Sequence, residues 1–286
     1  MTVVIKVGGA RAVDPAGALA DVASLVADGE RVVVVHGGST KVDKTLERLG
    51  VEPEYVETPS GVVGRFTDET TIEVFEMAFG HLNTQLVAGL QSEGVDAVGL
   101  NGVDGKLLYG PRKSAVRVVE DGTKKIRRGD HSGTIKQVNG DLLETLLDDG
   151  YTPVAAPPMA GKDDDEIIPV NTDADRSAAA IAGELDATLV LLTDVEGVYA
   201  DPDDPSTLIE SVETAADWDA LEDAAEGFMG RKIMAVEEAL DGGATEAVVA
   251  DANAESPIHS ALDGGGTHVY ASALEQDTDQ TATEEQ

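Results

Sequence analysis

The hydrophobic pattern divides the chain into short apolar runs and longer amphipathic stretches. Residues 3–7, 32–35 and 188–193 are almost continuous runs of Val, Ile and Leu. Such runs indicate strands that are buried on both faces, as in a parallel sheet. Residues 14–28, 40–49 and 67–92 instead repeat apolar side chains at helical intervals, and Thr67-Asp68-Glu69 is typical of a helix start. The first half therefore predicts a β-α-β-α order.

Later segments extend this pattern. Residues 55–66 contain Pro59, Gly61 and Gly64 and predict an irregular hairpin, and glycines divide residues 106–136 into short pieces that predict hairpins projecting from the sheet. Further strands are expected at 97–100, 152–155, 247–250 and 268–270, further helices at 142–147, 173–185, 218–225 and 232–240, and a turn at 157–162. Together they predict an α/β three-layer sandwich with a mainly parallel central sheet.

The domain organisation follows from where this pattern ends. Residues 1–270 are expected to form one domain, with a division near residue 172 into an N-terminal lobe (about 1–172) and a C-terminal lobe (about 173–270). Residues 271–286 are polar, acidic and rich in Thr and Gln, which predicts a disordered tail.

Composition excludes several classes of protein. The chain of 286 residues has no cysteine, which rules out disulfides and thiolate metal sites, and its five histidines are too scattered to predict a metal site. No apolar run approaches the ~20 residues of a membrane span, and the N-terminus resembles a strand more than a signal peptide, so a cytoplasmic location without membrane contact is expected. P-loop and dinucleotide-binding motifs are both missing.

The charge is unevenly distributed. The chain carries 20 Lys and Arg against 55 Asp and Glu, a formal charge of −35, which is typical of the solvated surface of a halophile's protein. Residues 106–136, the basic segment, hold nine basic and three acidic side chains, a net charge of +6, whereas the rest of the chain carries −41. Such a cluster predicts a docking surface for an acidic partner. Nucleic acid is disfavoured because the remaining charge is so negative and, apart from Tyr109 near its start, the basic segment has no Phe, Tyr or Trp between its basic residues.

Two glycine pairs, Gly8-Gly9 and Gly37-Gly38, each follow a predicted strand and precede a predicted helix. Backbone amides at such turns attract anions, and glycine lets a phosphate approach the backbone closely. Lys6 ends the first strand. The repetition in consecutive βα units therefore indicates a phosphate-binding edge.

Six ordered motifs resemble those of the amino-acid kinase superfamily, and within it the acetylglutamate kinase group. They are Lys6-Val-Gly-Gly9, His36-Gly-Gly38, Gly64-Arg-Phe-Thr-Asp68, Val170-Asn-Thr-Asp-Ala-Asp175, Thr193-Asp-Val-Glu-Gly-Val-Tyr199 and Met229-Gly-Arg-Lys232. Val42-Asp43, Thr58-Pro-Ser-Gly61 and the basic segment further resemble archaeal kinases of the amino-group carrier pathway, which act on LysW-linked aminoadipate or glutamate. The resemblance covers residues 2 to about 270.

This resemblance implies roles for individual residues. Lys6 and Lys232 would contact the transferring phosphoryl group, and Asp175 would orient both. Gly9 and Gly38 would donate amides to that group. The acceptor would be bound by Gly37, Gly38, Arg65 and Asn171. The nucleotide, ATP with Mg²⁺ held mainly by the nucleotide itself, would be bound by Gly8, Gly9, Thr193, Asp194, Tyr199 and Asp201. The two lobes would bind acceptor and nucleotide respectively, and no protein metal ligand is expected.

The implied activity is phosphorylation of the side-chain carboxylate of glutamate or 2-aminoadipate bound to a small acidic LysW-type carrier, for arginine or lysine biosynthesis. The carrier would dock on Lys124, Lys125, Arg127 and Arg128, and the enzyme would be a homodimer. One alternative is a kinase of free N-acetylglutamate, which gives the basic segment no use. Another is a non-catalytic amino-acid-binding regulatory module, against which both lysines and Asp175 argue. The sequence leaves open glutamate against aminoadipate, the dimer interface and feedback regulation.

Overall fold

The computed structural model describes residues 1–8, 15–59, 61, 63–120, 122–225 and 227–275. A large mixed sheet crosses this part of the chain in the order β12-β14-β13-β11-β1-β2-β9-β6-β7, with β5 and β10 paired to β9 and β8 paired to β6. These strands are β1 (Thr2–Val7), β2 (Arg31–His36), β5 (Ala97–Gly102), β6 (Leu108–Glu120), β7 (Thr123–Gly133), β8 (Gln137–Val138), β9 (Thr152–Asp163), β10 (Glu166–Val170), β11 (Thr188–Thr193), β12 (Ser211–Val212), β13 (Glu246–Asp251) and β14 (Thr267–Tyr270).

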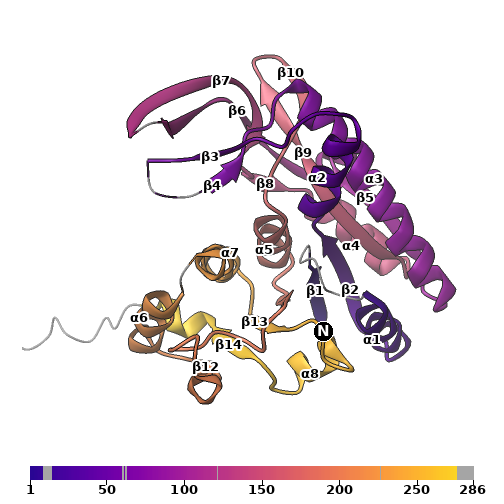
Figure 1. The fold of residues 1–286 in the computed structure, drawn as a ribbon. Coiled ribbons are helices and arrows are strands. Elements are labelled where there is room, and N and C mark those ends of the chain that lie inside the picture. The colour runs from indigo at the N-terminus through magenta and orange to yellow at the C-terminus, as the bar shows by residue number, and fades with distance from the viewer. Residues whose placement is uncertain (9–14, 60, 62, 121, 226, 276–286) are drawn as a thin grey trace, which may run out of the picture.

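Helices cover both faces of the sheet (Figure 1). They are α1 (Pro15–Ala27), α2 (Ser39–Arg48), α3 (Glu69–Ser92), α4 (Gly140–Asp148), α5 (Ala174–Glu184), α6 (Ala215–Ala224), α7 (Phe228–Asp241) and α8 (Pro257–Leu262), with 3₁₀ turns at Asp104–Lys106, Pro205–Thr207 and Ala271–Leu274. None of these helices is both long enough and apolar enough to cross a membrane.

The alternation of side chains along the central strands builds two cores. Val4 of β1 faces the layer of α4, α5 and α7, whereas Val3 and Ile5 face the layer of α1, α3 and α8. Successive side chains point to opposite faces of a strand, so a continuous apolar run serves both layers. The predicted α/β three-layer sandwich with a mainly parallel sheet is confirmed. β1 pairs in parallel with β2 and β11, so the turns after these strands lie at one edge of the sheet.

Two hairpins extend from the same side of the molecule (Figure 1). β3 (Tyr55–Glu57) and β4 (Val63–Arg65) form the hairpin predicted at 55–66. The basic segment forms one long hairpin from β6 and β7, not several short ones, and its β6 strand lies against β3. Both hairpins stand above α5 and α7 in this view.

The turn predicted at 157–162 is wrong, because β9 continues as a strand to Asp163. Pro157 and Pro158 suggested a turn since proline cannot donate to a strand ladder. In the structure, the pairing of β9 with β5 jumps from Ala156 to Met159, so both prolines lie at an irregularity where no ladder donor is needed.

The structure describes residues 271–275, the first part of the predicted tail. Residues 271–274 form a 3₁₀ turn in which Ala273 is buried, and Leu274 packs against the core. Residues 276–286 lie outside the described residues. The proposed division into an acceptor and a nucleotide lobe stays a prediction.

Candidate functional site

A buried carboxylate joins two lysines from different elements. Lys6 is the last residue but one of β1, Asp175 lies in the first turn of α5, and Lys232 lies in the second turn of α7. The Nζ atom of Lys6 lies 2.7 Å from Oδ1 of Asp175, and that of Lys232 lies 3.0 Å from Oδ2. All three side chains are less than 15% exposed. The structure therefore brings together the three residues expected to be catalytic.

The electrostatics of this cluster favour a bound anion. Burial raises the pKa of the Asp175 carboxyl, but the attraction of Lys6 and Lys232 outweighs burial and holds that pKa below its usual value. Burial, together with the like charge of Lys6, lowers the pKa of Lys232. One carboxylate thus keeps two ammonium groups close together, and the charge of Asp173 also acts on Lys232. Two lysines that share one direct carboxylate partner suit a bound anion such as a phosphoryl group.

The α5 terminus fixes the position of Asp175. Asp173 is the N-cap residue, and its carboxylate accepts hydrogen bonds from the backbone N–H groups of Asp175 and Arg176 at 2.8 and 3.1 Å. The cap satisfies two donors that the helix itself leaves free. The capped first turn of α5 therefore holds the Asp175 side chain in its orientation toward the two lysines.

The second glycine pair lies between β2 and α2. His36 ends β2, and Gly38 is the N-cap residue of α2. A Cβ on Gly38 would lie 2.7 Å from Cδ1 of Leu82 and 3.2 Å from Cε2 of Phe79, so a side chain at this position would have to displace Leu82 and crowd Phe79 of α3. Gly8 follows β1 at the same edge, and Gly9 lies outside the described residues.

Arg65 ends β4 and is held by an acidic partner that sequence reasoning missed. Its Nη1 atom forms an ion pair with Asp43 of α2, and its Nη2 atom donates to the Tyr55 hydroxyl at 2.9 Å. The guanidinium lies over the rings of Tyr55 and Phe75. The Arg65 side chain is only 5% exposed. Asp43 thus orients the Arg65 guanidinium. A further carboxylate that bound to this guanidinium would share it with Asp43.

Asn171 follows β10 and is hydrogen-bonded to the base of the basic hairpin. Its Nδ2 atom donates to the Thr67 hydroxyl at 3.1 Å, and its backbone N–H donates to the His131 carbonyl of β7 at 2.7 Å. Asp130, which is buried, accepts from the Thr67 N–H at 3.2 Å. The root of the hairpin and the neighbourhood of Asn171 therefore form one hydrogen-bonded unit.

The residues expected to bind nucleotide follow β11, whose neighbour in the sheet is β1. Thr193 ends β11, and its hydroxyl contacts Asp194 at 3.2 Å. The Tyr199 hydroxyl donates to Glu196 at 2.9 Å, and Asp201 lies in the turn that follows, where its backbone N–H donates to Thr207. These residues share the sheet edge with Lys6, but in the part of the chain that the structure describes no hydrogen bond or ion pair joins them to the lysine cluster.

The four basic residues expected to dock a partner lie on two faces of the hairpin, not on one. Lys125 and Arg127 share one face of β7, since side chains alternate along a strand. Lys125 pairs with Glu120 at 2.9 Å, and Arg127 pairs with Glu54 through both its terminal nitrogens while lying 4.1 Å above the Phe66 ring. This inner face is therefore already neutralised by the chain's own carboxylates.

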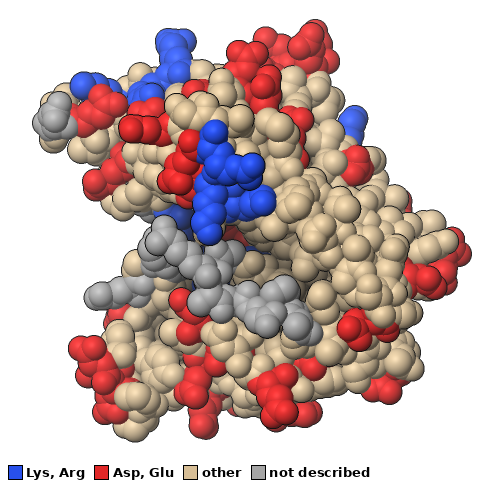
Figure 2. All heavy atoms as spheres, turned by 45° about the vertical axis from the view of Figure 1, so that its right-hand side comes forward, with Lys and Arg blue, Asp and Glu red and all other residues tan. Residues whose placement is uncertain are grey.

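The outer face of the hairpin has a different character. Lys124 and Arg128 flank Ile126, which is 65% exposed, and Arg117 lies directly across from Ile126 on β6. In the described residues, none of these three cations has an ion pair. In the view of Figure 2, Lys and Arg lie on the upper part of the molecule with Asp and Glu among them, whereas the lower part shows Asp and Glu without Lys or Arg.

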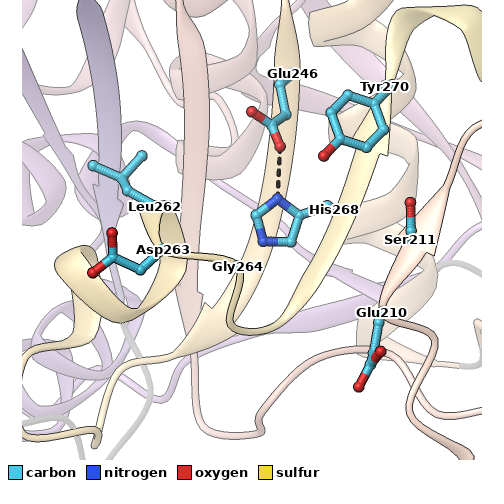
Figure 3. Close-up of a pocket in the computed structure, with 8 residues that line it drawn as sticks. All are labelled: Glu210, Ser211, Glu246, Leu262, Asp263, Gly264, His268 and Tyr270. Atoms are coloured by element: carbon cyan, nitrogen blue, oxygen red, sulfur yellow. Dashed lines mark hydrogen bonds and ion pairs between the residues drawn. The ribbon is translucent and has the colours of Figure 1, made fainter.

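Two pockets lie outside the lysine cluster. One of about 480 Å³ is lined by residues that include His268 of β14 and Glu246 of β13, which pair at 2.6 Å (Figure 3). A second of about 400 Å³ lies between α3 and β9 and is lined by Asn83 and Phe79. No group of three acidic or histidine side chains in the described residues is arranged to hold a metal ion.

Comparison with known proteins places this geometry in a family. The model of the amino acid kinase family matches residues 1–251. The chain belongs to the amino acid kinase family. The resemblance of the six motifs is thereby confirmed, and the Lys6–Asp175–Lys232 cluster lies within the matched residues.

Individual relatives differ in the acceptor that their names state. The chain is 43% identical to the LysW-aminoadipate kinase of Thermus thermophilus, over 93% of this chain and 99% of that protein. It is 42% identical to the acetylglutamate kinase of Methanopyrus kandleri, over the same shares. Overall identity to members of this kinase family therefore does not separate a carrier-linked acceptor from a free one.

A solved structure shares the fold. The N-acetylglutamate synthase of Neisseria gonorrhoeae, complexed with coenzyme A and N-acetyl-glutamate, superposes with a TM-score of 0.74 at 26% identity. The match covers 94% of this chain, which spans 59% of the synthase chain. The family member described here thus corresponds to one part of that larger protein.

Proposed function

We propose that this amino acid kinase transfers the γ-phosphoryl group of ATP to the side-chain carboxylate of glutamate or 2-aminoadipate carried by a small acidic protein of the LysW type. Names of relatives such as the LysW-aminoadipate kinase support the reaction. The observation that carries the choice of acceptor is the basic β6–β7 hairpin, whose root is hydrogen-bonded to Asn171 and Thr67 beside the acceptor site.

The reaction needs little from the protein except position and charge. An oxygen of the ionised acceptor carboxylate attacks the γ-phosphorus, the bond to the β,γ-bridging oxygen breaks, and an acyl phosphate and ADP result. No proton is transferred, so no general base is required. Two anionic reactants must be brought in line and the charge of the transition state stabilised.

The residues of the cleft suit these two tasks. Lys6 and Lys232 would lie against the transferring group, and Asp175 would hold them at a fixed separation in a buried site where their charges act strongly. Asn171 would orient the acceptor, and Arg65, already directed by Asp43, would bind the acceptor's carboxylate.

The nucleotide would bind to Gly8, Gly9, Thr193, Asp194, Tyr199 and Asp201 along the sheet edge. Mg²⁺, when bound, would neutralise phosphate charge. Both oxygens of Asp175 face lysines, which leaves that carboxylate unsuited to a metal ion and supports coordination mainly by the nucleotide.

The carrier would dock on the outer face of the hairpin. Its cations Arg117, Lys124 and Arg128 surround Ile126, a combination that complements an acidic surface with an apolar residue at its centre. The inner-face residues Lys125 and Arg127 would instead brace the hairpin, through Glu120 on β6 and through Glu54 and Phe66 beside the β3–β4 hairpin. Docking there would bring a flexible carrier terminus to the acceptor site beside Asn171.

The assembly and setting are part of the same proposal. A homodimer, a cytoplasmic location and a halophilic host are consistent with the family and with the charge of −35. A dimer would have twice the 29.7 kDa mass of the chain in light scattering.

The product identifies the reaction. Purified protein, ATP and each acceptor are incubated with hydroxylamine, which converts an acyl phosphate to a hydroxamate. We expect a hydroxamate on the carrier-linked residue. Hydroxamate formation only with free N-acetylglutamate would establish the second candidate, which the identity to the Methanopyrus enzyme favours. No hydroxamate with either acceptor would favour a non-catalytic regulatory module.

A further inference from the structure

A buried histidine beside the glycine pair has no part in the proposed reaction. His36 is 2% exposed, and its ring stacks on Phe79 with the centroids 5.8 Å apart. Its Nδ1 atom lies 3.1 Å from the Gly37 carbonyl oxygen, and its Nε2 atom lies 3.3 Å from Nδ2 of Asn83. Asn83 belongs to α3, which packs over the glycine pair.

The partners of the ring determine its tautomer. The amide nitrogen of Asn83 donates to the Val154 carbonyl at 2.8 Å, which fixes the orientation of that amide. Because the Gly37 carbonyl oxygen can only accept, Nδ1 of His36 must carry the proton, and the neutral ring then leaves Nε2 as an acceptor. The second proton of the Asn83 amide lies within reach of this Nε2 atom at 3.3 Å and of the Leu100 carbonyl at 3.4 Å. Burial also lowers the pKa of His36 to about 4, so the ring is neutral at physiological pH.

This hydrogen bond has a geometric consequence for the next amide. In a trans peptide, the C=O of Gly37 and the N–H of Gly38 point in opposite directions. A proton on Nδ1 that draws the Gly37 oxygen toward the His36 ring therefore turns the Gly38 N–H away from the ring. Among the described residues, no acceptor is found for that N–H. It lies at the N-terminus of α2, where anions are favoured.

We propose that His36 and Asn83 form a positioning pair that holds the Gly37–Gly38 peptide with its N–H directed at the transferring phosphoryl group. Asn83 offers a donor to the unprotonated Nε2, the Nδ1 proton of His36 holds the Gly37 carbonyl, and the peptide plane transmits this orientation to the Gly38 amide. The inference rests on the proposed phosphoryl transfer, but it does not depend on which acceptor is used.

Two substitutions of His36 separate the proton on Nδ1 from the bulk of the ring. His36→Asn keeps a donor near the Nδ1 position, whereas His36→Gln places its amide near the Nε2 position and leaves the Gly37 oxygen without a donor. We expect kcat of His36→Asn to stay within about fivefold of wild type, and kcat of His36→Gln to fall about 30-fold or more, as for loss of an aimed amide donor. KM for ATP should change little in both.

Equal kcat values for two folded variants, or a loss confined to KM, would overturn the proposal. A readout on the unmodified protein keeps it testable if a variant fails to fold. Imidazole ¹⁵N shifts of the wild type, with His36 assigned by substitution, should show a neutral ring protonated at Nδ1 between about pH 5 and 8, as follows from the lowered pKa. Protonation at Nε2 would contradict the pair. Absence of turnover with any acceptor would refute the proposed function alone, since the tautomer is measured independently.

Discussion

At the scale of single residues, Asp175 is central to the site because it holds both lysines. Lys6→Ala and Lys232→Ala should each lower kcat by about two orders of magnitude or more, since each removes a charge directed at the transition state. Nucleotide affinity, measured by calorimetry, should fall less. Arg176→Ala is the matched control: it follows Asp175 on α5 but pairs with Glu238, and its kcat should stay near wild type. Near-normal kcat in either lysine variant would remove that lysine from the mechanism.

The lowered pKa of Asp175 makes a prediction about stability in acid. Its folded-state pKa lies below the ordinary value of 3.8, so its contribution to stability is fully present above that value and is lost as the pH falls through the folded-state pKa. Denaturant unfolding should therefore give a stability difference between wild type and Asp175→Asn that is constant from about pH 5 to 8 and shrinks below about pH 4. A difference that persists unchanged at about pH 2 would contradict the ion pairs.

At the scale of elements, the two faces of the β6–β7 hairpin should behave differently. Reversing Lys124 and Arg128 to Glu should raise KM for the carrier-linked acceptor about tenfold or more and leave ATP binding unchanged, because these cations are free to pair with a partner. The control reverses Lys44 and Arg48 on the exposed side of α2. Lys125→Glu with Arg127→Glu should instead lower thermal stability by breaking the contacts with Glu120 and Glu54. If charge reversal at all three pairs of residues changed KM for the carrier-linked acceptor equally, the outer face of the hairpin would not be the docking face.

The same hairpin shows which features of the structure the sequence predicts and which it does not. The runs at 3–7, 32–35 and 188–193 predicted the central strands because continuous burial leaves a continuous apolar signature. The basic segment predicted projecting hairpins, but neither that they form one long hairpin nor that Glu54, 73 residues earlier in the chain, neutralises Arg127. Asp43 beside Arg65 and Asn83 beside His36 were missed for the same reason. Ordinary polar residues on helices gain a role only when the fold brings distant elements together.

At the scale of the whole molecule, the charge of −35 should make stability depend on salt. Acidic side chains spread over the surface repel one another, and at about 1 M salt the screening length shrinks to about 3 Å. The thermal unfolding midpoint should therefore rise when KCl is increased from about 0.1 to about 2 M, as scanning calorimetry would measure. An unchanged or falling midpoint would contradict a surface adapted to high salt.

The proposed docking must also work at high salt. Screening at molar salt leaves only close contacts effective, so direct pairing on the outer face should matter more than long-range attraction. In wild type, kcat/KM for the carrier-linked acceptor should fall as the salt concentration rises. The fall should come mainly from an increase in KM, with kcat less affected. A decline confined to kcat would place the salt effect in the catalytic cleft instead.

The most direct test of the central claim is the ratio of kcat/KM for carrier-linked glutamate to that for free N-acetylglutamate, measured with the wild-type protein. We expect a ratio far above one, which falls toward one when Lys124 and Arg128 are reversed to Glu. A wild-type ratio below one would show that the free amino acid is the acceptor and that the basic hairpin serves another purpose.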